Sequence, residues 1–194
     1  RLSGKAPVVK GHRTLDAGFQ FLLSYLEKSG SAGMDLSTSA AEIRKRFSEE
    51  GKELTAAMPN GVSTKDHQVG SNGESIRVRE YSPDRLGAIA PALVYFHGGG
   101  WVIGDIDTCD SVCRELATLA GLVVGAVDYR KAPEHVFPAA VDDCYAVVKW
   151  VSDNQEAVSG NGRVGVAGES AGGNLAAVTA LMARDQDGPE LAFQ

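Results

Sequence analysis

The sequence predicts an α/β fold with a mostly parallel sheet and helices on both of its faces. Two observations carry this prediction. Short apolar runs recur without alternation, as expected of parallel strands that are covered on both sides, at 92–96, 122–127 and 164–167. Stretches with the apolar spacing of a helix lie between or after these runs, at 112–119, 141–148 and 175–181. This alternation indicates right-handed crossovers and a ligand site at the carboxyl ends of the strands.

Two helices are predicted ahead of the strands. Apolar residues recur at helical spacing from 15 to 28, and Gly30 ends that stretch. A second, shorter helix is predicted over residues 39–51, with Ile43 and Phe47 facing inward. We expect these two helices to precede every strand of the chain.

The core is predicted to begin after the two helices. From Ser75 to Tyr81, Ile76 and Val78 alternate with arginines, which is typical of a strand with one wet face at the edge of a sheet. We therefore divide the chain into an N-terminal helical cap, residues 1–60, and the N-terminal part of an α/β core, residues 61–194, whose sheet is incomplete.

Composition argues against nucleic-acid and membrane partners. The chain has 19 Lys and Arg against 25 Asp and Glu, a formal net charge of −6, whereas nucleic-acid binding needs a basic face. Every apolar run is far shorter than the roughly 20 residues that cross a bilayer. The first 30 residues hold no continuous apolar segment of a secretion signal. We expect a cytoplasmic protein.

The three cysteines give no evidence of a metal site. Cys109, Cys113 and Cys144 are odd in number and lie in helix-like stretches, which is typical of free buried thiols in a reducing compartment. Cys109 and Cys113 are four residues apart, but no histidine or further cysteine clusters with them to complete a zinc site. We predict that no metal is bound.

Two glycine-rich motifs each follow a buried run directly. The first is His-Gly-Gly-Gly-Trp at 97–101, and the second is Gly-Glu-Ser-Ala-Gly-Gly at 168–173. In a chain of this composition a G-x-S-x-G match is expected by chance about 0.2 times, and His-Gly-Gly-Gly about 0.006 times. The two motifs together, each at the end of a predicted strand, are therefore a specific signal.

The second motif predicts a strand, a tight turn and a helix with Ser170 at the corner. Such a turn strains the serine backbone and pushes its hydroxyl out of the sheet. The residues two before and two after must be tiny, and Gly168 and Gly172 meet that demand. The helix that follows directs its positive dipole end at the serine, so the Ala171 N–H becomes an anion donor.

This arrangement indicates acyl transfer. Ser170 Oγ would attack an ester carbonyl, and the resulting oxyanion would accept hydrogen bonds from the Ala171 N–H and from two of the N–H groups of Gly98, Gly99 and Gly100. The sequence leaves open which two. Losing one such donor costs an enzyme about 2.7 to 4 kcal/mol of transition-state stabilisation. The alternative is a glycine turn before a helix, with a capping serine.

The motifs resemble those of a known family. The matching segments occur in the same order and spacing, at 97–100, 128–130, 132–134, 137–140, 142–143 and 168–175. They are similar to the hormone-sensitive-lipase-like esterases of the α/β-hydrolase superfamily, from about Pro91 to the last residue. The resemblance implies an intracellular carboxylesterase for short or medium acyl chains that needs no cofactor. It also implies that the N-terminal helices cap the substrate pocket. Lys131 replaces the leucine that is common in the family.

Other motif residues have structural interpretations. His97 precedes the serine, whereas the catalytic base of this fold follows it, so we predict that its ring pins the glycine loop. Asp128 and Arg130 are interpreted as an internal ion pair or loop brace. Glu169 is expected to face away from the substrate and to support the site indirectly. Trp101 either lines the substrate pocket or packs under the cap.

The remaining candidates are assigned to packing or to the surface. His12, His67 and His135 have no motif around them, so we interpret them as surface or packing residues. Asp142 and Asp143 are expected to cap or brace the start of their helix rather than to bind a metal.

A catalytic triad cannot be completed within these residues. After Ser170 the sequence continues for 24 residues without a histidine, and Asp185 and Asp187 lack the strand context of an acid partner. In the resembled family the Asp and His come from loops after later strands, and 191–194 look like the start of the next strand. We expect the chain to be inactive alone and to be part of a longer polypeptide, or to be completed by a second chain or C-terminal fragment.

Three hypotheses follow. The first is a serine carboxylesterase that hydrolyses short- to medium-chain carboxylic esters through an acyl-enzyme on Ser170. The second is a non-catalytic small-molecule-binding protein on the same scaffold, like the gibberellin receptors, which have lost the catalytic histidine. The third is a half-protein that is active only with a partner fragment.

Overall fold

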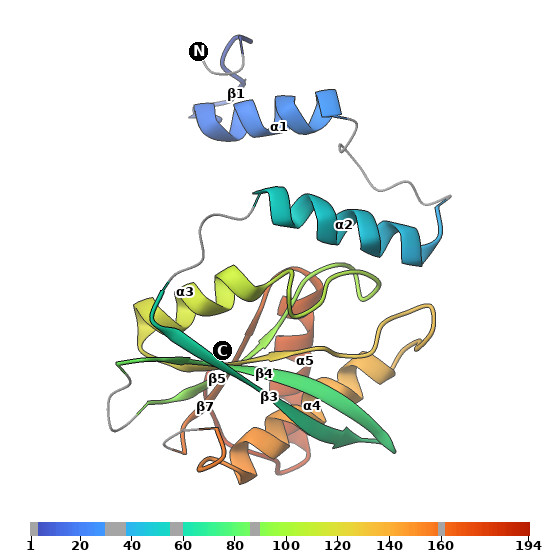
Figure 1. Ribbon diagram of the computed structural model, residues 1–194, viewed down its shortest axis with the longest axis vertical. Helices are drawn as coiled ribbons and strands as arrows, with labels where there is room; N and C mark the ends of the chain where they lie inside the picture. Colours follow the sequence, from blue (N-terminus) through green and yellow to red (C-terminus); the bar gives the residue numbers. More distant parts are fainter. Residues whose placement is uncertain (1–3, 30–37, 55–59, 86–89, 159–161) are drawn as a thin grey trace. The chain divides into compact units, whose positions relative to one another are not determined.

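A six-stranded mixed sheet organises residues 40–194 in the computed structural model (Figure 1). The structure describes residues 4–29, 38–54, 60–85, 90–158 and 162–194. In spatial order the strands are β3 (Val62–Ser71), β4 (Glu74–Pro83), β6 (Val123–Val127), β5 (Ala92–Phe96), β7 (Val164–Gly168) and β8 (Leu191–Phe193). The β3–β4 and β4–β6 pairs are antiparallel, and the other three pairs are parallel. The predicted α/β fold is therefore confirmed.

Helices cover both faces of this sheet. Helix α3 (Asp110–Ala120) packs on one face, and α4 (Ala139–Asp153) and α5 (Ala171–Asp185) pack together on the other (Figure 1). In β5, Leu93 and Tyr95 join the core under α3, while Val94 and its alternate neighbours join the core under α4 and α5. Because both faces are buried, the strand sequences show no alternation. None of the helices in the described ranges is both long and apolar enough to cross a membrane.

Strand β3 was not predicted, and its presence makes β4 an internal strand of the sheet instead of an edge strand. The expected alternation holds, with Ile76 and Val78 buried and the intervening arginines half-exposed. However, the prediction of an edge strand is wrong, because β3 pairs with β4 over its whole length, from Val62 opposite Pro83 to Ser71 opposite Glu74. The β3 sequence is polar and mostly exposed, so hydrophobic periodicity gave no signal for it.

The N-terminal unit, residues 1–39, contains the first predicted helix as α1 (Ala17–Ser29). Two short strands, β1 (Val9–Lys10) and β2 (Arg13–Thr14), precede it, so the expectation that helices come before every strand is wrong. The helix holds this N-terminal segment through Gln20, whose amide donates to Ala6 O at 2.7 Å and accepts from Val8 N at 3.2 Å. Gly30 lies outside the described residues.

The second predicted helix is α2 (Ala40–Leu54), which belongs with the sheet rather than with the N-terminal unit. It continues past Gly51, and Phe47 is exposed rather than inward, while Ile43 is half-buried. Arg44 on this helix contacts the glycine loop, where its Nε donates to Val102 O at 2.6 Å. The boundary between the two compact units thus falls between residues 39 and 40, ahead of α2, whereas the sequence predicted it between residues 60 and 61. Residues 55–59, just before the predicted boundary, are not among the described residues.

The topology brings the two glycine motifs to one edge of the sheet. Strands β5 and β7 are parallel neighbours, and their last residues, Phe96 and Gly168, lie opposite each other. From β5 the chain crosses by α3 to β6 on one side, and from β6 it crosses by α4 to β7 on the other side of β5. Such a reversal of strand order opens a crevice at the carboxyl ends of the strands.

Candidate active site

Ser170 occupies the sharp corner that the sequence predicts. Strand β7 ends at Gly168 and α5 begins at Ala171, so only Glu169 and Ser170 make the turn. Ser170 is exposed, with φ 55° and ψ −116°, a conformation that is costly for a residue with a Cβ. The turn is fixed by Glu169 N, which donates to Phe96 O at 3.3 Å.

The two glycines around the serine have no room for a side chain. A Cβ on Gly168 would lie against the backbone of Gly172 and 2.7 Å from Phe96 O. A Cβ on Gly172 would overlap Phe96 O and lie 2.7 Å from His97 O. Because these obstacles are backbone atoms, of α5 and of the end of β5, they cannot move aside. The requirement for tiny residues at both positions is confirmed.

The glycine loop, residues 97–104, makes a tight turn beside the serine. Gly99 and Gly100 have φ of 120° and 60°, conformations that favour glycine. Gly99 O accepts from the N–H groups of Val102 and Ile103, at 3.1 and 2.9 Å, and this closes the turn. A Cβ on Gly99 would overlap the backbone of Ile103, so the turn can form only with glycine there.

The N–H groups expected to act as donors are available. Within the described residues, none of the backbone N–H groups of Gly98, Gly99, Gly100 and Ala171 has a hydrogen-bond acceptor. The carboxylate of Glu169 lies against Gly98 and occupies the space that a Cβ would need. Glu169 therefore contacts the glycine loop.

His97 is buried beneath the glycine loop and cannot reach solvent. Its side chain stacks on Tyr129, with ring centroids 4.2 Å apart and an interplanar angle of 12°. Nδ1 donates to Gly98 O at 2.7 Å, and the Tyr129 hydroxyl donates to His97 O at 2.7 Å. Burial lowers the pKa of His97 to about 4, so the ring is neutral at physiological pH. These contacts fit the predicted pinning of the loop.

Asp128 and Arg130 brace the loop between β6 and α4, but not as a pair with each other. Arg130 Nη2 binds the fully buried carboxylate of Asp143 at 2.7 Å, and the same carboxylate accepts from Arg130 N at 2.9 Å. Asp128 binds Arg77 and Lys131 at 3.0 Å each. Burial acts to raise the pKa of Asp128, but the two cations outweigh it and the pKa lies below its ordinary value.

The acidic pair at the start of α4 braces rather than caps. Pro138 is the N-cap residue and no side chain caps the helix, so of the two predicted roles, capping and bracing, the structure fits bracing. Asp143 instead holds Arg130, and Asp142 accepts from Asn72 Nδ2 at 3.0 Å. Lys131, which replaces the leucine common in the resembled family, has a defined partner in Asp128.

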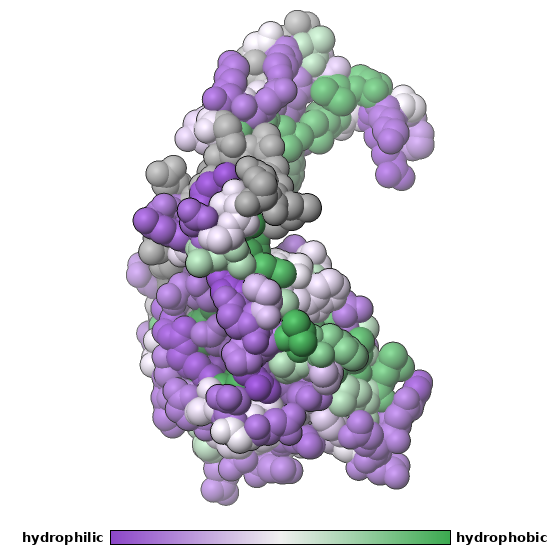
Figure 2. Space-filling model, turned by 90° about the vertical axis from the view of Figure 1, so that its right-hand side faces the viewer, coloured by the Kyte–Doolittle hydropathy of each residue, from purple (hydrophilic) through white to green (hydrophobic). Residues whose placement is uncertain are grey.

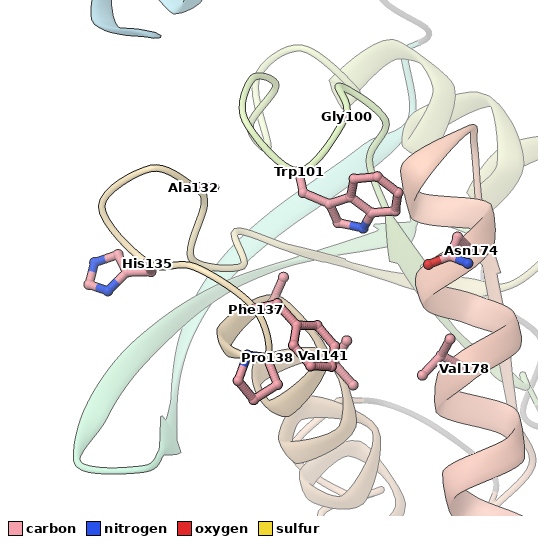
Figure 3. Close-up of a pocket in the computed structure, with 10 residues that line it drawn as sticks. Gly100, Trp101, Ala132, His135, Phe137, Pro138, Val141, Asn174 and Val178 are labelled. Atoms are coloured by element: carbon pink, nitrogen blue, oxygen red, sulfur yellow. The ribbon is translucent and has the colours of Figure 1, made fainter.

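An apolar pocket of about 400 Å³ lies beside the serine turn. Figure 3 shows the ring of Trp101 extending from the glycine loop toward Asn174 on α5, with Phe137 and Val141 on the opposite wall. Trp101 therefore lines this pocket, which was one of the two alternatives for it. Asn174 lies one helical turn after Ser170 and its N–H donates to Ser170 O at 3.1 Å, so the lining of the pocket begins one turn of α5 beyond the serine. The residues that line it are Gly100, Trp101, Ala132, His135, Phe137, Pro138, Ala140, Val141, Asn174 and Val178.

Part of this lining was open to prediction. Asn174 and Val178 follow Ser170 at intervals of four residues, so helical spacing alone puts all three on one face of α5. Phe137 and Pro138 lie within the motif at 137–140 that resembles the esterase family. Figure 2 shows apolar side chains gathered on the surface of the unit that contains the sheet. Nothing in the sequence indicated the contacts of Arg44, because its partners lie 58 to 90 residues further along the chain.

The cysteines and His67 do not line the pocket, His12 belongs to the N-terminal unit, and His135 is one of the pocket residues. Cys109, Cys113 and Cys144 are free and buried, as predicted. His12 is exposed and His135 is exposed at the pocket. The His67 side chain is 8% exposed, with its Nε2 2.7 Å from Glu80 and its ring beside Trp150. Within the described ranges, no three His, Cys, Asp or Glu side chains converge as a metal site would require.

A mostly parallel α/β sheet that presents a strained serine and a glycine loop at adjacent strand ends defines the α/β-hydrolase class. The family model of the alpha/beta hydrolase fold matches residues 93–194. The chain therefore belongs to the α/β-hydrolase family, in its group of hormone-sensitive-lipase-like esterases.

Relatives support this placement. Esterase LipI of Mycobacterium tuberculosis is 48% identical over 130 residues, which is 66% of this chain and 40% of that protein. Carboxylic ester hydrolase LipN of the same organism is 38% identical over 193 residues, or 95% of this chain and 49% of LipN. An esterase structure from the archaeon Pyrobaculum calidifontis superposes with a TM-score of 0.82 at 41% identity, covering 91% of this chain and 56% of that one. The chain spans about half the length of the curated relatives it matches.

The serine turn gives a first prediction. Gly172→Ala should lower the free energy of unfolding of the intact protein by about 3 kcal/mol, because the new Cβ meets immovable backbone. Gly173→Ala is the matched control, since its Cβ comes no closer than 3.3 Å to Gly168 O and alanine favours the helix by about 1 kcal/mol. Urea unfolding of both variants measures the difference. Equal stabilities would contradict the packing described.

His97 gives a second prediction. Burial lowers its pKa from 6.5 to about 4, so between these values the unfolded state binds more protons than the folded state and acidification destabilises the fold. Through this residue, the free energy of unfolding should fall by about 2 kcal/mol between pH 7 and pH 5. Urea unfolding at both pH values measures the loss, and His97→Asn should remove that much of it. If His97→Asn keeps the full loss of stability between pH 7 and pH 5, that loss does not come from His97.

Proposed function

We propose that the intact protein is a serine carboxylesterase that forms an acyl-enzyme on Ser170. The observation that carries the proposal is the exposed, strained Ser170 at the start of α5, next to a glycine loop with available N–H groups. Ser170 Oγ attacks the ester carbonyl carbon while a base takes its proton, and the alcohol leaves with a proton. Water then attacks the acyl-enzyme, which releases the carboxylic acid and restores the serine.

The negative charge that forms on the carbonyl oxygen would be stabilised by backbone donors. The Ala171 N–H at the positive end of α5 and two of the N–H groups of Gly98, Gly99 and Gly100 are proposed for this role. Donors held in place before the reaction need no reorganisation as charge develops, which makes such a site effective.

The pocket beside the serine supports an ester with a short or medium apolar chain as the substrate. Its volume of about 400 Å³ lies at the small end of ligand pockets, and its lining is largely apolar, with Trp101, Phe137 and Val178 among the contributors. Hydrolysis by a serine nucleophile uses water as the second reactant, so the proposal includes no cofactor. The curated relatives described above are named for ester hydrolysis.

The nucleophile has a direct test. In the intact protein, Ser170→Ala should lower turnover of p-nitrophenyl butyrate by at least about 10³-fold, since removal of the nucleophile abolishes the acyl-enzyme. A fluorophosphonate probe should label the wild type at the peptide that contains Ser170 and leave the variant unlabelled. Ser111→Ala, a half-buried helical serine remote in sequence, is the control and should keep full turnover. Unchanged turnover in Ser170→Ala would exclude the mechanism, and wild type that neither turns over ester nor takes up probe would favour a non-catalytic binding protein.

The proton-accepting base is proposed to come from outside these residues. No histidine follows Ser170 in the sequence, and His97 is buried with its Nδ1 committed to Gly98 O. We therefore expect residues 1–194 produced alone to show no turnover of p-nitrophenyl butyrate, and addition of the remainder of the intact protein as a separate chain to restore it. The measurement is initial rate with and without that fragment. Turnover by residues 1–194 alone would refute this part of the proposal.

A further inference from the structure

Arg44 on α2 binds both loops that flank the serine turn. Its Nε donates to Val102 O in the glycine loop at 2.6 Å, and its Nη2 donates to Ala132 O in the loop between β6 and α4 at 2.7 Å. Nη1 and Nη2 also donate to the two carboxylate oxygens of Glu134, at 2.8 and 2.7 Å. One guanidinium thus joins a helix and two loops that are distant in the sequence.

The contact lies at the junction of the two loops. Ala132 N donates to Trp101 O at 2.9 Å, and Arg44 binds the carbonyls of Ala132 and of Val102, the residue after Trp101. Gly100, Trp101 and Ala132 also line the apolar pocket. Arg44 therefore holds the backbone that forms one wall of the pocket.

The role of this contact is geometric rather than energetic. The hydrogen bond from Arg44 lowers the pKa of Glu134 to about 2, so the carboxylate stays charged. However, the Glu134 side chain is 52% exposed and the Arg44 side chain 26% exposed, and ion pairs so open to solvent add little stability. What the guanidinium provides is a planar fork that binds a carboxylate with two N–H groups while other N–H groups reach two carbonyls.

We propose that Arg44 is a positioning residue for the esterase reaction, which keeps the N–H groups of the glycine loop where the oxyanion forms. This inference rests on the proposed function. The loop is held at its beginning by His97 and beyond its glycines by Arg44 at Val102. Between these points lie three glycines, whose backbones have no side chains to restrict them, and Gly99 O ties them to Val102 and Ile103, the segment that Arg44 holds. A displacement of about 1 Å in such a site can cost on the order of 10²-fold in rate.

Kinetics of the intact protein test the proposal. Arg44→Ala should lower kcat for p-nitrophenyl butyrate by about 10-fold or more and change KM by less than about 3-fold, because the donors act on the transition state. Arg44→Lys should remain impaired, since an ammonium keeps the charge but cannot bridge the same three acceptors. Lys45→Ala is the matched control, because it removes one positive charge from an exposed neighbouring position on α2 and should keep full kcat. Wild-type kcat in Arg44→Ala, or full rescue by lysine, would overturn the proposal.

A second readout separates this proposal from the esterase assignment. In a Trp150→Phe background Trp101 is the remaining tryptophan of these 194 residues. Where the rest of the intact protein has tryptophans, they are replaced by phenylalanine as well. Arg44→Ala should then increase acrylamide quenching of Trp101, and Lys45→Ala should not. Unchanged quenching would overturn the positioning role even if Ser170→Ala had already refuted the esterase function. Urea unfolding midpoints are measured in parallel, and Arg44→Lys, the milder change, provides both readouts if Arg44→Ala does not fold.

Discussion

The site depends on the close approach of two backbones, the end of β5 and the turn after β7. Phe96 O accepts the N–H of Glu169 and lies against Gly172, so no side chain intervenes between the strand that leads into the glycine loop and the turn that carries Ser170. The distance from Ser170 to the glycine loop is therefore set by main-chain contacts. The parallel pairing of β5 and β7 places both segments at the same edge of the sheet.

The three glycines of the loop have no side chains to pack and wide conformational freedom, so other contacts must hold them. Within the loop, Gly99 O accepts from Val102 N and Ile103 N, and the Ile103 side chain is buried; neighbouring groups add further contacts. His97 packs beneath it against Tyr129, and Arg44 binds it from α2. The adjoining loop is in turn held by the buried pair of Arg130 and Asp143. A buried ion pair contributes little net stability compared with apolar packing, but its loss is costly, so it fixes one loop geometry at the expense of others.

Sequence reasoning located the parts of this site that depend on local chemistry. The apolar runs gave the buried strands, and the steric demand of the serine turn gave Gly168 and Gly172, since both follow from short-range constraints. It missed β3, whose polar residues show no hydrophobic periodicity, and it interpreted α2 by its apolar residues although Arg44 binds the glycine loop. Asp128 and Arg130 were expected to form an internal ion pair or to brace a loop, and they brace the loop through separate partners, Arg77 and Asp143, that lie 13 or more residues away. Which acidic side chain binds which basic one depends on the tertiary structure, and the hydrophobic periodicity of the sequence does not indicate it.

Glu169 raises an electrostatic question, because a carboxylate beside Gly98 would oppose negative charge on a substrate oxygen near the same loop. Glu169 is exposed, and at about 4 Å in water two unit charges interact by only about 1 kcal/mol, less with salt. Each preorganised backbone donor contributes about 2.7 to 4 kcal/mol, and the end of α5 adds its positive dipole at Ala171. The proposed donors therefore outweigh the carboxylate, and the contact of Glu169 with Gly98 is compatible with the proposed anion stabilisation.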